Sequence, residues 1–439
     1  MSSSTSTAPG FVAIDFGTSN SAVALPAGPQ GVRLVALEPG QPTMPTAVFY
    51  RADTPPQHLE AECLYGRAAV AAYVEGLDGR LMRSMKSILG SSLLDQSTDI
   101  GGGRQVRYRE VVTGYLRRLK TLAEAEAGQT LHRVVLGRPV FFVDDDAVRD
   151  AQAAVALESA AHEVGFAEVR FQFEPIAAAL DHESRIDHEQ LVLVADIGGG
   201  TSDFSLVRVG PERARRGRAD RRDDILANHG VHLAGTDFDR HVELAAILPL
   251  LGYRALRPAR PGEAPREVPS GVYFDLATWH LINTVYAPAR VAELRGMKSW
   301  YGEPRHHVRL MNAVTERLGH ALAAAAEQAK IDVATQGEAH IDLGALEAGL
   351  AAVLQEDRAA EAIEGDLGRI VQAAAETTRQ AGVAPAAVDV VYFTGGSSGL
   401  RPLVDRIAAG FPAAQRVRGD RFASVAQGLG LHARAVYGS

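Results

Sequence analysis

The stretch that most constrains this chain is Leu191 to Val207, LVLVADIGGGTSDFSLV. Two short apolar runs flank three glycines, and this pattern predicts two strands joined by a hairpin. Glycines permit positive φ in such a turn, and its successive N–H groups form a concavity suited to phosphate. Three glycines alone fit a plain hairpin equally well. The flanking Asp196, Thr201 and Asp203 favour a functional site, because two carboxylates beside a phosphate require a divalent cation between them.

A second copy of this pattern lies near the N-terminus, at Phe11 to Leu25, FVAIDFGTSNSAVAL. An apolar run ends on Asp15, a Gly17-Thr18-Ser19 turn follows, and a second apolar run returns. The two aspartates are separated by nearly half the chain. Repetition over this distance predicts two related lobes, each with a phosphate-binding hairpin.

A third glycine signal lies at Val388 to Val404, VDVVYFTGGSSGLRPLV. Here a strand runs into Gly395-Gly396-Ser397, and a helix is predicted from Leu400. A strand, a Gly-rich turn and a helix N-terminus together suit an anion or the edge of a nucleotide.

Three further segments carry candidate residues. Arg80 to Leu89 is a short amphipathic segment that contains Lys86. Glu174-Pro175 separates a strand from a helix, and proline in the first helical turn leaves Glu174 outside the helix, free to point into a cleft. Glu327 and Lys330 lie on one face of a helix at spacing (i, i+3), which also suits an ordinary salt bridge.

Composition excludes several classes of protein. The 439 residues allow two or three domains, and 46% apolar with 22% charged residues is typical of a globular protein. No apolar run reaches about 18 residues, so no membrane span is expected. The N-terminal MSSSTSTAPG predicts a disordered tail rather than a signal peptide. A single cysteine, Cys63, excludes an internal disulfide and suggests the cytoplasm.

Charge adds three expectations. The net charge of −8 argues against nucleic-acid binding. The strongly charged segment from Gly210 to Asp224 predicts a solvated surface turn. Only four of the 45 basic residues are lysines, which suggests that a compact ammonium group is needed at some of these positions.

Taken together, these segments resemble the actin-like ATPase superfamily, and more closely the ATPase domain of the heat-shock-seventy chaperones. The two Asp-Gly hairpins resemble the family's phosphate loops, and TGGSSGLRPLV its adenosine loop. Four other segments match in the correct order: RSMKSILG, FEPIAAAL, HLAGTDFD and EQAKIDVA. The resemblance covers roughly Phe11 to Tyr437.

The resemblance implies a role for each matching residue, with ATP or ADP and Mg²⁺ as ligands. Asp15 and Asp196 would hold Mg²⁺, largely through waters. Lys86, Glu174, Thr201 and Asp203 would act in catalysis, on the γ-phosphate, the attacking water and the metal. The phosphates would be bound by Gly17, Thr18, Ser19, Gly198, Gly199, Gly200 and Thr201. The nucleoside would be framed by Gly235, Glu327, Lys330, Gly395, Gly396 and Ser397.

The chain departs from the family at several of these segments. Gly399 replaces an arginine that stacks on adenine, and Ile331 and Ala334 replace an arginine and a serine in the overlying helix. Asn20 replaces an aromatic residue beside the first phosphate loop, and Ala234 replaces a glycine. No peptide-binding domain is recognised after Tyr437, so peptide capture cannot be inferred.

The predicted fold class is α/β: a two-lobed actin-like ATPase, with duplicated ribonuclease-H-like domains around a nucleotide cleft. We expect a disordered tail at residues 1–10 and lobe I at 11–186, with an insert at about 40–105 and a C-terminal helix at 424–439 returning to it. Lobe II is expected at 187–423, with a peripheral subdomain at about 236–365.

The predicted function is slow, Mg²⁺-dependent hydrolysis of ATP coupled to lobe opening and closing, in a cytoplasmic chaperone-like protein. Its expected partners are ATP and protein clients or co-chaperones, with no nucleic acid and no membrane. Two alternatives remain: a small-molecule kinase of the same superfamily, and an actin-like filament or scaffold.

Overall fold

The computed structural model describes most of the chain and forms two compact units. Unit 1 comprises Met1–Gly230, Ala373–Ser398 and Ala408–Ser439, and unit 2 comprises Val231–Gln372 and Gly399–Ile407. The predicted tail lies outside the described residues, apart from Gly10. The structure describes residues 10–28, 31–53, 63–101, 103–143, 146–215, 221–258, 264–419 and 423–438.

The first sheet of unit 1 has the order β11-β10-β1-β2-β3, with β4 also paired to β2. Strands β1 and β2 form the predicted antiparallel hairpin, and β1, β10 and β11 run parallel. Central strand β1 is buried almost throughout, as expected for a strand covered on both faces. The strands are β1 (Phe11–Phe16), β2 (Asn20–Ala27), β3 (Gly31–Leu34), β4 (Thr43–Pro45), β10 (Arg133–Arg138) and β11 (Glu168–Phe173).

The second sheet of unit 1 repeats this topology in the order β14-β13-β12-β17-β18. Strands β12 and β13 form an antiparallel hairpin, and β12, β17 and β18 run parallel. The strands are β12 (Gln190–Ile197), β13 (Ser202–Val209), β14 (Ile225–Val231), β17 (Val390–Thr394) and β18 (Gln415–Arg418). The predicted α/β class with two related sheets is therefore confirmed. The assignment of residue ranges to lobes I and II remains a prediction.

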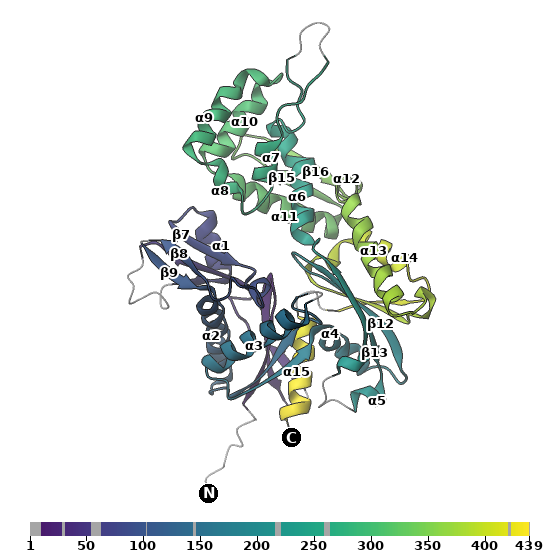
Figure 1. Cartoon of the computed structure of the whole chain (residues 1–439). Helices are drawn as coiled ribbons and strands as arrows, with labels where there is room; N and C mark the ends of the chain where they lie inside the picture. Colours follow the sequence, from purple (N-terminus) through teal and green to yellow (C-terminus); the bar gives the residue numbers. More distant parts are fainter. Residues whose placement is uncertain are drawn as a thin grey trace. The chain divides into compact units, whose positions relative to one another are not determined.

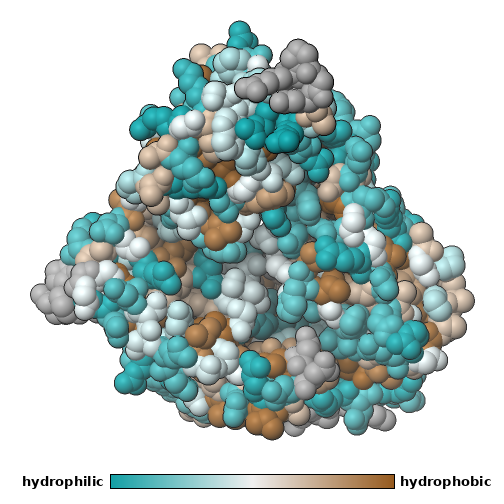
Figure 2. Space-filling view, turned by 45° about the horizontal axis from the view of Figure 1, so that its top comes forward, coloured by the Kyte–Doolittle hydropathy of each residue, from teal (hydrophilic) through white to brown (hydrophobic). Residues whose placement is uncertain are grey.

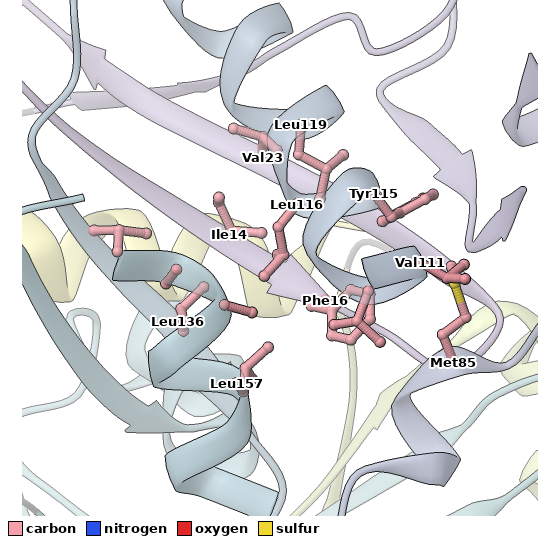
Figure 3. Close-up of a cluster of buried hydrophobic side chains, with 14 of the residues drawn as sticks. Ile14, Phe16, Val23, Met85, Val111, Tyr115, Leu116, Leu119, Leu136 and Leu157 are labelled. Carbon is pink, nitrogen blue, oxygen red and sulfur yellow. The ribbon is translucent and has the colours of Figure 1, made fainter. Parts of the chain in front are cut away.

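Helices α2 (Tyr108–Ala127) and α3 (Ala147–Glu163) cover one face of the first sheet. Figure 3 shows the core beneath them, where Ile14 and Phe16 of β1 meet Leu116 of α2 and Leu157 of α3. Helix α2 ends at Gly128, whose φ of 66° is the left-handed conformation that glycine adopts most readily.

Helices α4 (Glu174–Glu183) and α15 (Ser424–Tyr437) pack against each other and join the two sheets through one core. Helix α15 lies on β1, β2 and β10, whereas α4 also contacts β12 and β13 (Figure 1). Glu174 was expected before the helix, but it is the first residue of α4 and Pro175 the second. Proline lacks an N–H, and the first helical turn needs none, so the helix begins one residue earlier than predicted.

The close crossing of α4 and α15 depends on Gly428. A Cβ atom at this position would lie 1.8 Å from the carbonyl oxygen of Ala177. We therefore expect Gly428→Ala to lower the free energy of unfolding by about 3 kcal/mol, the upper end of typical overpacking costs. Urea denaturation followed by circular dichroism would measure the change.

The matched control is Gly368→Ala, in the middle of helix α13, where a Cβ atom would meet no heavy atom within 4 Å. This change should stabilise the protein by up to about 1 kcal/mol, because alanine has the higher helix propensity. Equal stability of the two variants would refute the close-contact explanation.

A smaller layer lies beside the first sheet, in the region predicted as an insert. Strands β6-β5-β7 form a three-stranded sheet with α1 packed against it, and β8 pairs with β9. The segment that contains Lys86 is strand β7 followed by a 3-10 helix, Met85–Ile88. The elements are β5 (Ala47–Arg51), β6 (Leu64–Tyr65), β7 (Gly79–Arg83), β8 (Ser97–Gly101), β9 (Arg104–Arg107) and α1 (Gly66–Val74).

The charged segment from Gly210 to Asp224 is only partly a surface turn. Residues 216–220 lie outside the described part, but Arg221 and Asp224 are buried at 3% and 4% exposure. Arg221 donates two hydrogen bonds to Glu183 of α4 and a third to Asp224. Prediction of a fully solvated turn was therefore wrong, because Glu183, distant in sequence, supplies a buried carboxylate for Arg221.

Unit 2 is mainly helical and has its own core. Its strands β15 (Glu338–Asp342) and β16 (Ala351–Gln355) form an antiparallel pair. Its helices are α6 (Gly235–Val242), α7 (Gly271–Leu276), α8 (Ile282–Val285), α9 (Pro288–Gly296), α10 (Pro304–Thr315), α11 (Gly319–Gln336) and α12 (Glu356–Ala362). The remaining helices are α5 (Pro211–Ala214) in unit 1, and α13 (Glu364–Gln380) and α14 (Arg401–Ala409), each of which has residues in both units.

The core of unit 2 contains a buried acid, Glu243, at the start of a π-helical turn after α6. It is 1% exposed, and its Oε1 has no hydrogen-bond partner among the described residues. Burial raises the pKa of Glu243 well above its ordinary value of 4.5, and repulsion from Asp239 adds to the shift. Glu243 is therefore protonated in the folded protein at pH values where it would ionise in the unfolded chain.

This pKa difference predicts that stability falls as pH rises. Below about pH 4.5 both states are protonated, so the folded state bears no penalty. Above it, the unfolded state gains stability by ionising, and the free energy of unfolding falls by up to about 1.4 kcal/mol per pH unit until the folded pKa is reached. Glu243→Gln, measured by urea denaturation between about pH 5 and pH 8, should remove this contribution. An unchanged pH dependence in the variant would contradict it.

The surface mixes residue types. On the face shown in Figure 2, hydrophilic residues predominate and hydrophobic residues occur singly or in small groups. Among the described residues, no helix has the length and apolar character needed to cross a membrane.

Candidate functional site

The first hairpin places Asp15 near the end of β1, followed by the turn Gly17 to Ser19. The turn is tight: a Cβ atom at Gly17 would lie 2.1 Å from the carbonyl oxygen of Asn20, so only glycine fits. The strand-turn-strand arrangement predicted from the sequence is confirmed here.

The second hairpin has the same form. Asp196 lies near the end of β12, and Asp203 is its direct cross-strand neighbour on β13. Within the turn, the N–H of Gly198 donates to the carbonyl oxygen of Thr201 at 2.9 Å. The Thr201 hydroxyl donates to Asp203 Oδ2 at 2.8 Å, which fixes two of the predicted catalytic side chains relative to each other.

The two hairpins meet within unit 1. A Cβ atom at Gly199 would lie 2.6 Å from Ser19 Oγ, so the second turn approaches the first as closely as glycine allows. Residues separated by nearly half the chain thus come into contact.

Lys86 reaches this region from the 3-10 helix Met85–Ile88. Its Nζ donates to Glu174 Oε1 at 2.5 Å, and both side chains are mostly buried. Glu174 also lies close to Gly137 of β10, where an added Cβ atom would be 3.3 Å from its Oε1. Lys86 and Glu174 were predicted as site residues from two separate segments. In the structure their side chains form one ion pair.

The cluster around this ion pair holds more negative than positive charge. Asp15, Asp196 and Glu174 interact electrostatically with Lys86, and Asp203 acts on Asp196. Burial raises the pKa of Asp15 to about 8, with repulsion from Glu174 adding to the shift. Burial raises the pKa of Asp196 to about 7, with Asp203 and Glu174 contributing. Carboxyls that hold protons this strongly indicate a site that favours a further cation.

The electrostatic environment of Lys86 is the opposite. Burial alone would lower its pKa, but the carboxylates of Glu174 and Asp15 outweigh this effect and raise it. Lys86 is therefore a permanent ammonium group, suited to stabilise negative charge on a ligand rather than to exchange protons.

These residues fit a hydrated Mg²⁺ ion. Oxygen ligands suit this metal, which usually retains several waters and takes only one or two carboxylates from the protein. The described residues contain no group of three or more His, Cys, Asp or Glu side chains that could hold a metal directly. Asp15 and Asp196 offer two carboxylates, the number that this metal commonly takes from a protein.

The third glycine loop packs against the second hairpin. Gly395 has a φ of 84°, and a Cβ atom there would lie 2.5 Å from Asp196 Oδ1. Gly396 begins a 3-10 helix, Gly396–Gly399, and the Ser397 hydroxyl donates to the carbonyl oxygen of Gly198 at 2.9 Å. The loop therefore supports the phosphate hairpin as well as carrying the residues predicted to contact nucleoside.

The other predicted nucleoside residues, Gly235, Glu327 and Lys330, belong to unit 2. Gly235 is the first residue of α6, and Lys330 Nζ on α11 donates to its carbonyl oxygen at 3.2 Å. Lys330 Nζ also lies 2.6 Å from Asp239 Oδ1, whereas no direct ion pair with Glu327 is found. Because Gly395 to Ser397 lie in unit 1, a joint role for both sets remains a prediction.

Sequence reasoning missed two residues of these surroundings. Asp239 pairs with Lys330, and burial raises its pKa to about 6 even though Lys330 opposes the shift. Thr46 donates to the first hairpin. Asp239 lies in the HLAGTDFD segment, so its acidic side chain beside a matched motif was a signal that could have identified it. No local sequence pattern distinguishes Thr46.

Of the substitutions at the predicted nucleoside site, Ile331 is 43% exposed on α11. Gly399 ends the 3-10 helix of the third loop, and Ala334 lies one turn beyond Lys330 on α11. None of these three side chains offers a polar or aromatic group, so they cannot supply the stacking or polar contacts that the resemblance implies for other members.

Comparison with known proteins identifies a family model and two related chaperone proteins. A family model described as "Hsp70 protein" matches residues 11–245. A chaperone protein DnaK from Mycoplasmoides gallisepticum is 31% identical over 234 residues, which are 53% of this chain and 35% of that protein. A chaperone protein DnaK from Thermosipho melanesiensis is 30% identical over 233 residues, 53% of this chain and 34% of its own length.

The alignment thus spans about a third of the length of these curated relatives. The family match includes both hairpins, Lys86 and Glu174, and it ends before Lys330 and the third glycine loop. The phosphate side is therefore the part of the site with the strongest comparative support.

Proposed function

This chain belongs to the Hsp70 family, and we propose that its ATPase domain binds ATP with Mg²⁺ and hydrolyses it slowly to ADP and phosphate. The observation that carries the proposal is the convergence of two Asp-Gly hairpins and the Lys86–Glu174 ion pair in one buried charge cluster. Transfer of a phosphoryl group requires positioning and charge neutralisation more than covalent chemistry from the protein.

In this proposal the two turns bind the phosphates. Backbone N–H groups of Gly17 to Ser19 and of Gly198 to Thr201 act as donors from opposite sides, as in other phosphate nests. Asp15 and Asp196 hold the metal through waters. The metal held there would supply positive charge that offsets the charge on the phosphate oxygens.

The ion pair supplies the catalytic groups. Lys86 is an ammonium group at neutral pH and is placed to stabilise charge on the transferred phosphoryl group. Glu174 holds Lys86 in position and orients the attacking water. Thr201 and Asp203, joined by their hydrogen bond, orient water and metal from the second hairpin.

The relatives' names suggest a chaperone role, and we propose that nucleotide turnover here drives opening and closing of the lobes for a protein client or co-chaperone. This part of the proposal rests on the comparisons alone, which cover about a third of each relative. The finer assignment of Gly235, Glu327, Lys330, Gly395, Gly396 and Ser397 to the nucleoside is also proposed.

Titration calorimetry with ATP, ADP and GTP, each with and without Mg²⁺, tests the binding step. We expect ATP and ADP to bind, and Mg²⁺ to strengthen ATP binding. A phosphate-release assay on the same protein would then separate an ATPase from a kinase. Phosphate release in the absence of any added acceptor supports an ATPase. ATP consumption that depends on an added sugar or acid would instead support the small-molecule kinase.

A further inference from the structure

Thr46 lies between β4 and β5, outside both phosphate hairpins, yet it holds two carbonyl groups of the first one. Its hydroxyl donates to the carbonyl oxygen of Gly17 at 2.8 Å, and its backbone N–H donates to that of Ser19 at 2.9 Å. The residue is 1% exposed, so water does not compete readily for these bonds.

A buried hydrogen-bond network fixes the direction of the Thr46 hydroxyl. Ser21 Oγ lies 2.9 Å from Thr46 Oγ1. The Gly17 carbonyl can only accept, so Thr46 donates to it and Ser21 donates to Thr46. Tyr115 donates to the carbonyl oxygen of Pro45 at 2.9 Å, and its ring packs on Phe16 of β1 (Figure 3). Thr46 is thus bonded to the turn and to Ser21 of β2, and Tyr115 of α2 holds the residue before it.

Fixing a carbonyl also fixes the N–H of the same peptide unit. The peptide bond is planar and trans, so its C=O and N–H point in opposite directions. Holding the oxygen of Gly17 towards Thr46 therefore directs the Thr18 N–H away from it, and holding the oxygen of Ser19 does the same for the Asn20 N–H. Thr46 therefore constrains the direction of two N–H groups at this turn.

The second hairpin is held in a similar way. The Ser397 hydroxyl, 6% exposed, donates to the carbonyl oxygen of Gly198, which is the first glycine of that turn as Gly17 is of the first. Each turn therefore has the carbonyl of its first glycine bound by a buried hydroxyl from another segment. The same kind of contact is therefore present at both turns, made by residues from different segments.

We propose that Thr46 is a positioning residue for phosphate binding: it aligns the donors of the first hairpin and leaves the nucleoside end of the site unaffected. The inference rests on the proposed function, since it assumes that this turn binds phosphate. Without the hydroxyl, the Gly17 carbonyl loses this partner, and the Thr18 N–H of the same peptide unit is held less firmly in one direction.

The test is a pair of substitutions at Thr46. Thr46→Val keeps the shape and removes the hydroxyl, and Thr46→Ser keeps the hydroxyl. We expect Thr46→Val to lower the single-turnover rate of ATP hydrolysis about tenfold, the effect of one lost buried hydrogen bond, and Thr46→Ser to restore most of it. A purely structural role would lower the melting temperature of the valine variant without this loss of rate in the folded protein.

The matched control is Thr113→Val in α2. Thr113 is 2% exposed, and its hydroxyl has no partner within the described part of the chain. This variant should keep the wild-type rate. Should Thr46→Val fail to fold, Ser21→Ala replaces it, because it removes the donor to Thr46 and should slow hydrolysis severalfold.

The outcomes separate the two proposals. If the wild-type protein neither binds nor hydrolyses ATP, the proposed function fails. If the wild type hydrolyses ATP and folded Thr46→Val, or Ser21→Ala in its place, does so at the same rate, only the positioning inference fails. Loss of rate in both Thr46→Val and Thr113→Val would also refute it, since any buried threonine would then have the same effect.

Discussion

Replacement of Lys86 by alanine is expected to slow ATP hydrolysis by a factor of about 100 to 1,000 while nucleotide binding persists. Preorganised charge is the largest single contribution to catalysis at such sites, and removal of one such group typically has an effect of this size. Among the described residues, Lys86 is the one cation that acts on the carboxyl groups of Asp15 and Asp196, and it pairs directly with Glu174. Asp203 adds a further negative charge beside Asp196. Single-turnover phosphate release gives the rate, and calorimetry gives the affinity for ATP.

Lys298→Ala is the matched control, since this exposed lysine in unit 2 has no assigned role. It should behave as the wild type in both assays. Hydrolysis by Lys86→Ala at the wild-type rate would show that Lys86 does not contribute to catalysis. Loss of binding together with hydrolysis would instead make it a binding residue.

Asp196→Ala should have the second large effect, on the metal. With one of the two aspartates removed, we expect the Mg²⁺ concentration needed for half-maximal hydrolysis to rise by about 10- to 100-fold, as for other groups that hold a metal indirectly. The measurement is phosphate release over a series of Mg²⁺ concentrations.

A control for this change is Asp187→Ala, whose side chain is 97% exposed before β12. This variant should show the Mg²⁺ dependence of the wild type. An Asp196→Ala protein that bound Mg·ATP and hydrolysed it at the wild-type rate would exclude Asp196 from the site.

Much of the fold was predictable because its signals are local. Apolar runs that end on Asp15 and Asp196 indicate strands, and the glycines that follow indicate turns. The repetition of this pattern predicted two related sheets, which the structure contains.

What the sequence could not supply are contacts between distant segments. Thr46 and Ser397 act through carbonyl groups of the two hairpins, and a carbonyl group carries no sequence signature. Lys330 pairs with Asp239 rather than Glu327, because the fold brings α6 against α11. The burial of Arg221 likewise depends on Glu183 from another element.

In the candidate site, too, the residue types could be predicted from the sequence, whereas their arrangement could not. Its residue types follow from chemistry, since phosphate needs N–H donors, which the two turns offer, and a cation, which Lys86 offers from a separate segment. Their arrangement follows from the fold, which brings Lys86 to Glu174 and Gly199 to Ser19. The residues predicted for the nucleoside belong to two different units, and their joint role remains a proposal.

The most direct test of the central claim is phosphate release in a single turnover of ATP by the wild-type protein, with Mg²⁺ and with the metal chelated. We expect slow phosphate release that stops when Mg²⁺ is chelated and that is almost absent in Lys86→Ala. Release that continued without Mg²⁺, or at equal rates in wild type and Lys86→Ala, would contradict it.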